Sequence, residues 1–328
     1  MSRDPFAHKE GTQVVEILDC TSWQPYRGIP EGSGRSEKQW LVSDDGRIGL
    51  FKFPRVDPVS HSVTYEHVSE HLAHRIGTQL DVETATVNIA TYQGRIGSLS
   101  HLITNENESL LEGLHFILGK HPDFEQETLR FSKTNEYYSI RDILCFDMGG
   151  RFLEFWIKML LFDFMIGNSD RHQSNWAYIL SLDPESIASF SKGEGEFSEI
   201  LRPCPLYDNG SSLCCRVRDD QVQAFLGNDA LKLKSLVDTK SRSLVRIDPL
   251  SKKRPRHAEV VRYLLGKYPS AKCISEHFLN RLEGDSVRLL IDAYPDNLVQ
   301  PNRKRLLLKF IQGKTELLEK MMTENNHV

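Results

Sequence analysis

The sequence predicts an α+β protein of two lobes: a small β-rich lobe that contains one helix, and a larger, mainly helical lobe. Two patterns support this prediction. Over the first hundred residues, β-branched and aromatic residues are interrupted by Gly and Pro, which is typical of short strands. From about residue 109 onward, apolar residues recur at helical spacing. The length of 328 residues also favours two domains, which we expect at residues 1–105 and 106–328.

Composition and charge exclude several classes of protein. The chain carries 41 Lys and Arg against 45 Asp and Glu, a formal net charge of −4, and 39% of its residues are hydrophobic. These values are ordinary for a soluble folded protein and exclude a collagen, a coiled coil and a wholly disordered chain. The net charge argues against a protein that coats nucleic acid, although a local basic patch can still bind it.

The cysteines indicate a reducing compartment, and together with the charged start and the short apolar stretch they lead us to expect a cytoplasmic protein. Six cysteines, of which only Cys214 and Cys215 are close in sequence, form neither a disulfide framework nor a paired zinc motif. Residues 1–10 are charged where a signal peptide would be apolar. The most apolar stretch, residues 152–166, is shorter than the roughly 20 residues of a membrane span.

In the first lobe, five segments are expected to be strands of a mostly antiparallel sheet: residues 14–18, 39–42, 48–53, 84–91 and 95–99. The sequences Asp44-Asp45-Gly46 and Gln93-Gly94 are turn signals and predict two hairpins among these strands. Between the hairpins, apolar residues at helical spacing predict one helix over residues 62–76.

In the second lobe, apolar periodicity predicts helices over residues 110–118, 137–146 and 152–166, and four more from residue 258 onward. A strand is expected over residues 176–180, and short strands near Asp208. The polar residues 181–198 are interpreted as a hairpin loop that separates two polar motifs.

The first of these motifs is Gly-Asn-Ser-Asp-Arg-His-Gln-Ser-Asn at residues 167–175, between a buried helix and a strand. Phosphoryl transfer needs a carboxylate that orients the attacking hydroxyl and a neutral oxygen that helps to hold Mg²⁺. Asp170 and Asn175, five positions apart, supply both. In protein kinases His and Arg precede the aspartate, whereas here Arg171 and His172 follow it.

The second motif is Leu-Tyr-Asp-Asn-Gly-Ser-Ser at residues 206–212. Mg²⁺ prefers one or two carboxylates together with phosphate oxygens, so we expect Asp208 to join Asn175 at such an ion. The position matches the metal-binding Asp-Phe-Gly of protein kinases, with Asn209 in place of the phenylalanine.

Lys52 lies in the strand sequence Leu-Phe-Lys-Phe and needs a partner charge if it faces inward. We expect Glu66 of the following helix to be that partner, because such a pair holds the α and β phosphates of ATP in kinases. Glu70 lies on nearly the same helix face and is a close alternative. A lysine that extends to solvent from an edge strand is the other interpretation.

A Gly-rich segment precedes Lys52 at residues 28–38, with Gly32, Ser33 and Gly34 at its centre. Such a flexible connection between strands is suited to bring backbone N–H groups against phosphates. It does not match a Walker loop.

Together these motifs resemble those of the HipA-like serine/threonine kinases, most closely the compact kind without an N-terminal extension. The resemblance rests on Gly-Asn-x-Asp-Arg-His-x-x-Asn, Pro-Leu-Tyr-Asp-Asn-Gly-Ser-Ser, the strand lysine and the early Gly/Ser loop, over roughly residues 23–225. It implies a bilobal protein-kinase-like fold and a link to toxin–antitoxin systems. It also implies ATP- and Mg²⁺-dependent transfer of the γ-phosphate to Ser or Thr of a protein substrate.

The resemblance also assigns roles to residues. It implies that Asp170 is the catalytic acid/base, that Asn175 and Asp208 hold Mg²⁺, and that Lys52 holds ATP. The nucleotide contacts that it implies are His172, Gln173 and Tyr207, with Ser100, His101 and Leu102 as the hinge beside adenine. The serine that HipA toxins autophosphorylate corresponds to Ser33 or Ser36, and the sequence leaves that choice open.

Other interpretations stay open at this point. The Asp-Arg-His cluster can be a structural ion-pair network, and His172 can satisfy a buried carbonyl. A phosphatidylinositol 3/4-kinase-like lipid kinase has a similar catalytic loop, but no amphipathic membrane-docking helix stands out. A non-catalytic ATP-binding regulatory protein is the third alternative, and it need not keep Lys52, Asp170, Asn175 and Asp208 together.

A basic stretch extends from Arg202 to Arg256, with twelve Lys and Arg against six Asp. Its densest part is residues 252–256. A solvated loop is the default interpretation. The functional alternative is docking of an acidic partner, either a protein substrate or nucleic acid, beside the site.

Overall fold

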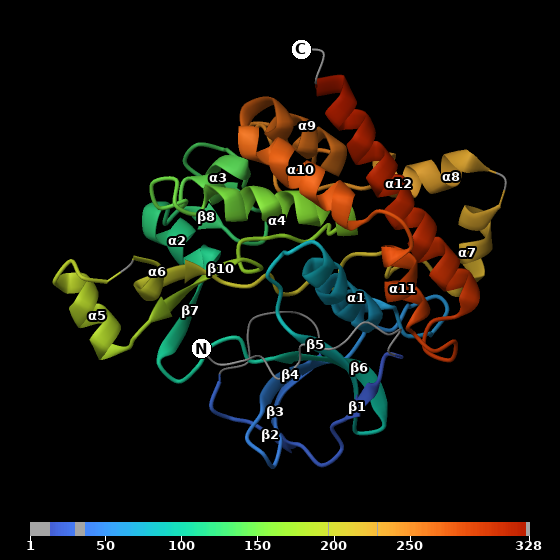
Figure 1. The fold of residues 1–328 in the computed structure, drawn as a ribbon, viewed down its shortest axis with the longest axis horizontal. Coiled ribbons are helices and arrows are strands. Elements are labelled where there is room, and N and C mark those ends of the chain that lie inside the picture. The colour runs from blue at the N-terminus through green and yellow to red at the C-terminus, as the bar shows by residue number, and fades with distance from the viewer. Residues whose placement is uncertain (1–13, 30–36, 196, 228, 326–328) are drawn as a thin grey trace.

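The first lobe is built on one sheet (Figure 1). In the computed structural model, which describes residues 14–29, 37–195, 197–227 and 229–325, six strands pair in the order β1-β5-β6-β4-β3-β2. Their bounds are β1 Ile17–Asp19, β2 Gln24–Pro25, β3 Lys38–Val42, β4 Ile48–Lys52, β5 Val87–Tyr92 and β6 Arg95–His101. β1 runs parallel to β5 and the other neighbours are antiparallel, which confirms the mostly antiparallel prediction.

Two tight turns set the register of this sheet. Between β3 and β4, Ser43 N donates to Arg47 O, and Gly46 has a φ of +84°. Between β5 and β6, Gln93 and Gly94 both have positive φ. Positive φ at both central positions gives a turn whose twist matches that of the strands. Both predicted hairpins are therefore confirmed.

Helix α1, Glu66–Gln79, packs on this sheet against β5 and β6. Its buried apolar residues include Val68, Leu72 and Ile76, which recur every four residues along one face. The helix predicted over residues 62–76 is confirmed, although it begins four residues later than expected. This helix and strand β4 supply the first-lobe side of the site described below.

The second lobe is organised around α4, Leu153–Ile166, whose residues from Met159 to Ile166 are all buried. A helix that is apolar on nearly every side has to lie inside the lobe. It is covered by α9 His257–Lys267, α10 Pro269–Arg281 and α12 Pro301–Asn325. Helix α11, Ser286–Asp292, contacts α12 and α1. The helices predicted from residue 258 onward are confirmed.

A second, antiparallel sheet joins β7 Glu108–Glu112, β10 Ala177–Ser181 and β11 Leu201–Pro203. The remaining elements are α2 Gly113–Lys120, β8 Phe124–Glu125, β9 Arg130–Phe131, α3 Ile140–Leu144, α5 Pro184–Ser191, α6 Phe197–Ile200, α7 Asp219–Leu226, α8 Ala230–Lys234 and a π-helical turn, Ser235–Thr239. Within the described ranges, no helix is long and apolar enough to cross a membrane. The division of the chain at residue 105 stays a prediction.

Three predicted elements differ from the structure. The helix expected over residues 110–118 is wrong in its first part, which forms β7 because it pairs with β10. The helix expected over residues 137–146 is shortened to α3, which starts at a capping box of Ser139 and Asp142. The loop expected over residues 181–198 contains α5 and the start of α6, since Asp183 caps the helix N-terminus by accepting from Ser186 N.

Close packing makes Gly113, at the start of α2, a testable position. A Cβ there would lie 2.2 Å from the buried ring of Trp176. We expect Gly113→Ala to lower the free energy of unfolding by about 1–3 kcal/mol, because the surrounding core would have to move. Gly119→Ala is the control in the same helix, since nothing lies within 4 Å of its added Cβ. Urea unfolding measures both variants, and equal effects would contradict this packing.

Candidate active site

A cleft separates β4 and α1 from the two polar motifs of the second lobe. The residues that line it come from both sides: Lys52, Phe53, Pro54, Arg55, Glu66, His67, Glu70, Ser98, Asp170, Asp208, Gly210 and Ser211. Four residues that the sequence singled out, Lys52, Glu66, Asp170 and Asp208, are therefore brought together although they are far apart in the chain.

Lys52 is held between two carboxylates. Its Nζ lies 2.9 Å from Oδ1 of Asp208 and 3.8 Å from Oε2 of Glu70, and its side chain is 19% exposed. Burial favours the neutral amine, but the charges of Asp208 and Glu70 outweigh it and raise the pKa of Lys52. The lysine is thus a half-buried cation paired within the cleft, and the interpretation of a side chain that extends to solvent is wrong.

The helix partner of Lys52 is Glu70, and the prediction of Glu66 is wrong. Glu66 lies one turn earlier, where its carboxylate accepts from Arg55 N and pairs with Arg55 Nε at 3.7 Å. Glu70 also accepts from Asn209 N at 2.9 Å, which ties α1 to the second motif. Burial and the nearby charge of Asp208 raise the pKa of Glu70, because Lys52 is drawn closer to Asp208.

Asp208 is presented to the cleft by a left-handed backbone conformation, with a φ of +57°. Such a conformation is costly for a residue other than glycine, and the neighbouring hydrogen bonds maintain it. Leu206 is anchored beside Glu83 and Ala85 by backbone hydrogen bonds. The charge of Lys52 lowers the pKa of Asp208 to about 2 and outweighs desolvation, so the carboxylate is ionised at neutral pH.

Gly210 lies two positions after Asp208 and against α1. A Cβ there would lie 2.8 Å from Oε2 of Glu70. A side chain at this position would therefore displace the carboxylate that pairs with Lys52.

Arg171 joins the two motifs from below the cleft. Its side chain is only 1% exposed and forms a bidentate pair with Asp163 of α4, at 3.0 Å from Nε and 2.7 Å from Nη2. Nη1 donates to the carbonyl oxygens of Asn175 and Tyr207, and Nη2 donates to Oδ1 of Asn209. The prediction of a structural ion-pair network is thus correct for Arg171, while Asp170 lines the cleft.

Asn175 is oriented by a hydrogen bond from its Nδ2 to the carbonyl oxygen of Asp170, at 2.8 Å. This bond fixes which edge of the amide carries Oδ1. Oδ1 of Asn175 and the carboxylate of Asp208 are two oxygen donors on segments that Arg171 holds together. Such oxygen donors fit Mg²⁺. The part of the chain that the structure describes has no cluster of three His, Cys, Asp or Glu side chains for a metal ion. Phosphate oxygens would therefore have to complete the coordination.

The other predicted nucleotide contacts lie at or near the two motifs. His172 accepts through Nδ1 from Ser174 N, and the hydroxyl of Tyr207 donates to Ser174 O. Burial raises the pKa of Tyr207 well above its ordinary value. The side chain of Gln173 is buried, and its Oε1 has no hydrogen-bond partner among the described residues.

The expected hinge and the Gly-rich loop are less closely connected to the cleft. Ser100 and His101 end β6 and Leu102 N donates to Ile48 O, but the cleft lining includes none of the three. Their contact with adenine stays a prediction. Gly32, Ser33 and Gly34 lie outside the described residues.

Sequence reasoning missed His67 and Arg55, which line the first-lobe side of the cleft. His67 is 5% exposed, its Nδ1 has no partner within the described ranges, and burial lowers its pKa to about 4. The available signals were their positions in the sequence: Arg55 lies three residues after Lys52, and His67 lies one residue after Glu66.

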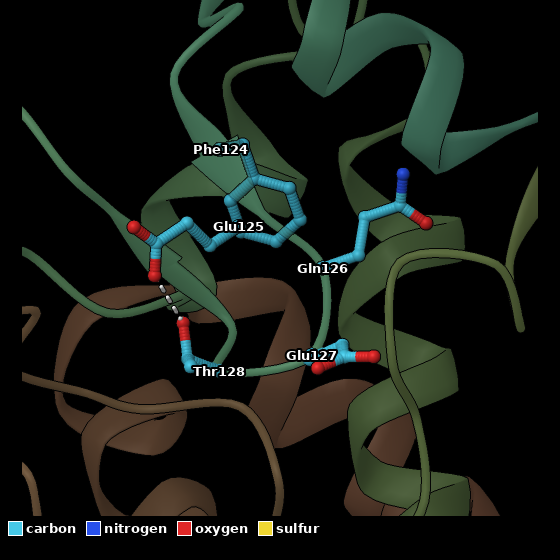
Figure 2. A pocket seen from close by; sticks show the side chains of 5 residues that line it. All are labelled: Phe124, Glu125, Gln126, Glu127 and Thr128. Carbon is cyan, nitrogen blue, oxygen red and sulfur yellow. Dashed lines mark hydrogen bonds between the residues drawn. The ribbon is translucent and has the colours of Figure 1, made fainter.

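Another pocket lies apart from this cleft, on the hairpin of β8 and β9 (Figure 2). Five consecutive residues line it: Phe124, Glu125, Gln126, Glu127 and Thr128. Thr128 Oγ1 donates to Glu125 Oε2 at 2.9 Å. The pocket shares no residue with the cleft, and a pair of acidic side chains on one hairpin does not indicate a ligand.

The buried pair of Arg171 and Asp163 predicts a large loss of stability when one partner is removed. We expect Asp163→Asn to lower the free energy of unfolding by about 3–5 kcal/mol, because it leaves the guanidinium charge buried and uncompensated. Asp220→Asn is the control, since it breaks an exposed pair with Arg218 and should change stability by no more than about 1 kcal/mol. Urea unfolding at pH 7 tests both, and comparable losses would refute a special role for Arg171.

Comparisons with known proteins place the fold. No protein-family model and no curated protein matches the chain in sequence. Among solved structures, the proinflammatory kinase CtkA of Helicobacter pylori has a TM-score of 0.73 at 18% identity, over 94% of this chain and 99% of that chain. HipA of the Shewanella oneidensis toxin–antitoxin system, solved with HipB and operator DNA, has a TM-score of 0.50 at 12% identity, over 99% of this chain and 70% of that chain.

At these identities the likeness concerns the fold alone. It agrees with the α+β, two-lobed organisation predicted from the sequence. The chain has a HipA-like kinase fold.

Proposed function

We propose that the protein is an ATP- and Mg²⁺-dependent kinase that transfers the γ-phosphate to a Ser or Thr hydroxyl of a protein substrate in the cytoplasm. One observation carries the proposal: Lys52, Asp208, Glu70 and Asp170 meet in one cleft of a kinase-like fold. Phosphoryl transfer needs little more than positioned charges of these types.

Each residue has a distinct task in this mechanism. Lys52 binds the α and β phosphates, and Glu70 keeps its ammonium in place from the helix side. Asp208 and Asn175 hold Mg²⁺, which supplies positive charge that neutralises the phosphates. Asp170 accepts a hydrogen bond from the substrate hydroxyl, orients its oxygen toward the γ-phosphate and takes up its proton.

The remaining nucleotide contacts belong to the same proposal. His172 and Gln173 lie in the catalytic loop, residues 167–175, and the hydroxyl of Tyr207 donates to Ser174 O of the same loop. The unpartnered Oε1 of Gln173 is an acceptor that a bound nucleotide can satisfy. Ser100, His101 and Leu102 are proposed to contact adenine, and Gly32, Ser33 and Gly34 to contact the phosphates. Autophosphorylation is proposed at Ser33 or Ser36.

The two aspartates should fail in different ways. Asp170 acts on the hydroxyl, so Asp170→Asn should leave Mg²⁺-dependent ATP binding nearly unchanged while phosphate transfer falls by a factor on the order of 10² to 10⁴. Asp208 acts on the metal, so Asp208→Asn should weaken both the Mg²⁺ dependence of ATP affinity and the transfer rate. Calorimetric titration with ATP at several Mg²⁺ concentrations, beside a transfer assay with labelled ATP, measures both.

Several results would count against the proposal. The roles would be reversed if Asp170→Asn alone abolished Mg²⁺-linked binding. Normal transfer by both variants would show that the loop is not catalytic. A wild-type protein that binds ATP but labels no protein would be a non-catalytic binder, and one that labels phosphatidylinositol vesicles in preference to peptides would be a lipid kinase.

The basic stretch of the sequence is divided in the structure. Arg202 pairs with Glu108 and Arg256 with Asp238, whereas Lys252, Lys253 and Arg254 are exposed. We propose that these three residues dock an acidic region of the protein substrate.

Charge reversal tests this docking surface. Lys252→Glu, Lys253→Glu and Arg254→Glu, combined in one variant, should raise KM for a Ser-containing acidic peptide several-fold and leave KM for ATP unchanged. The same peptide with its acids replaced by Gln is the control, because it should not distinguish the two proteins. The difference should shrink at high salt, which screens exposed charges. An unchanged KM for the acidic peptide at low salt would refute the docking.

A further inference from the structure

A buried hydrogen-bonded chain connects α12 and α9 with the catalytic loop. Lys314 Nζ lies 2.9 Å from Oγ of Ser241, and that Oγ lies 3.0 Å from Nδ1 of His257. Nε2 of His257 lies 2.8 Å from the carbonyl oxygen of Asn168. The chain thus ends on the residue that opens the catalytic loop, two positions before Asp170.

The protons in this chain have one consistent arrangement. A lysine ammonium can only donate, so Ser241 Oγ accepts from Lys314. A carbonyl oxygen can only accept, so His257 carries a proton on Nε2. Nδ1 then accepts from the hydroxyl of Ser241. Burial, with the charge of Lys314, lowers the pKa of His257 to about 3, in agreement with a neutral ring.

Lys314 is an unusual residue for this place. It is fully buried, its ammonium lies 4.6 Å from the ring centre of Phe164 and 5.4 Å from that of Phe310, and within the described ranges it forms no ion pair. Burial lowers its pKa to about 7. The other titratable groups that face it are Cys214, His257 and Asp238, and Asp238 is paired with Arg256.

The catalytic loop also depends on α12 in a second way, and on α4. Gly167 has a φ of +66°, and a Cβ there would lie 2.8 Å from Cζ of Phe310 on α12. The side chain of Asn168 links the loop to α4, because its Oδ1 accepts from Asp170 N and its Nδ2 donates to Oδ1 of Asp163. Its carbonyl, fixed by His257, and its side chain therefore set the backbone that carries Asp170.

We propose that Lys314, Ser241 and His257 are positioning residues for the transfer reaction: the chain that they form holds the Asn168 peptide so that Asp170 is aligned with the substrate hydroxyl. This inference rests on the proposed function. It gives a role to a charged side chain in a place where an isolated buried cation is costly.

The matched variants are Lys314→Met, Ser241→Ala and Ser241→Thr. Methionine fills the space between the two phenylalanine rings but donates no hydrogen bond. Ser241→Ala breaks the chain, whereas Ser241→Thr keeps the hydroxyl. We expect kcat to fall by a factor on the order of 10 to 100 in Lys314→Met and Ser241→Ala, because small misplacements of a catalytic group are costly. KM for ATP should be unchanged, and Ser241→Thr should retain kcat.

Stability separates positioning from a scaffold role. Lys314→Met should have a melting temperature equal to or above that of the wild type, because it removes a buried charge. The pKa of Lys314 is about 7 in the folded protein and 10.5 without burial. Between these two pH values the unfolded chain therefore binds more protons than the folded protein does. The stability of the wild type relative to Lys314→Met should therefore rise from pH 6 to pH 9, as measured by urea unfolding of the full chain.

Each outcome decides between the alternatives. Wild-type kcat in Lys314→Met or Ser241→Ala overturns the proposal. Destabilisation of Lys314→Met together with weaker ATP binding also overturns it, because Lys314 would then be a scaffold residue. If the wild-type protein has no transfer activity, the proposed function is contradicted instead. Urea unfolding between pH 6 and pH 9 then still tests whether the ammonium of Lys314 is buried. A relative stability that does not change between pH 6 and pH 9 overturns the buried chain itself.

Discussion

The geometry of the site depends on the burial of one guanidinium group. Arg171 is paired with Asp163 on the central helix, and its remaining donors reach the backbone or side chains of both polar motifs. Burial of such a pair is costly unless every donor is satisfied. Because one rigid, planar group makes all these bonds, the loop with Asp170 and the turn with Asp208 cannot shift independently. The two motifs are one structural unit, although thirty residues, 176–205, separate them.

Lys52 lies at the opposite side of this unit and is shared between two acids. Its shorter contact is to Asp208, and its longer one to Glu70. Under the proposed function, a metal ion at Asp208 would compete with the lysine for that carboxylate, while Glu70 would stay on the helix side of the lysine. Phosphate groups of the nucleotide would then replace Asp208 as the lysine's partner, so that binding of metal and of nucleotide would reinforce each other.

The sequence predicted what depends on local signals. Turn residues located the hairpins, and the polar motifs located Asp170 and Asp208. Glu70 was not separable from Glu66, because both lie on one helix face and the offset of about 6 Å along the helix is set by how α1 packs on β5 and β6. Strand β7 was missed because its partner β10 is far along the chain. The hydrogen bonds that link Lys314, Ser241 and His257 could not be predicted, since these residues belong to no common sequence motif.

Helix α12 has a consequence for how the protein is made. Three residues of α12 contact segments around the site: Arg303 donates to the carbonyl of Cys214, Phe310 packs against Gly167, and Lys314 bonds to Ser241. The packing of these segments therefore depends on a helix that is synthesised much later. At ordinary synthesis rates, on the order of ten seconds pass between synthesis of residues 167–175 and synthesis of that helix. During this interval the nascent chain has both polar motifs and the Arg171 network, but it lacks the contacts that α12 makes with the surrounding segments. The packing around Gly167 and Asn168 is therefore completed only after α12 has been synthesised.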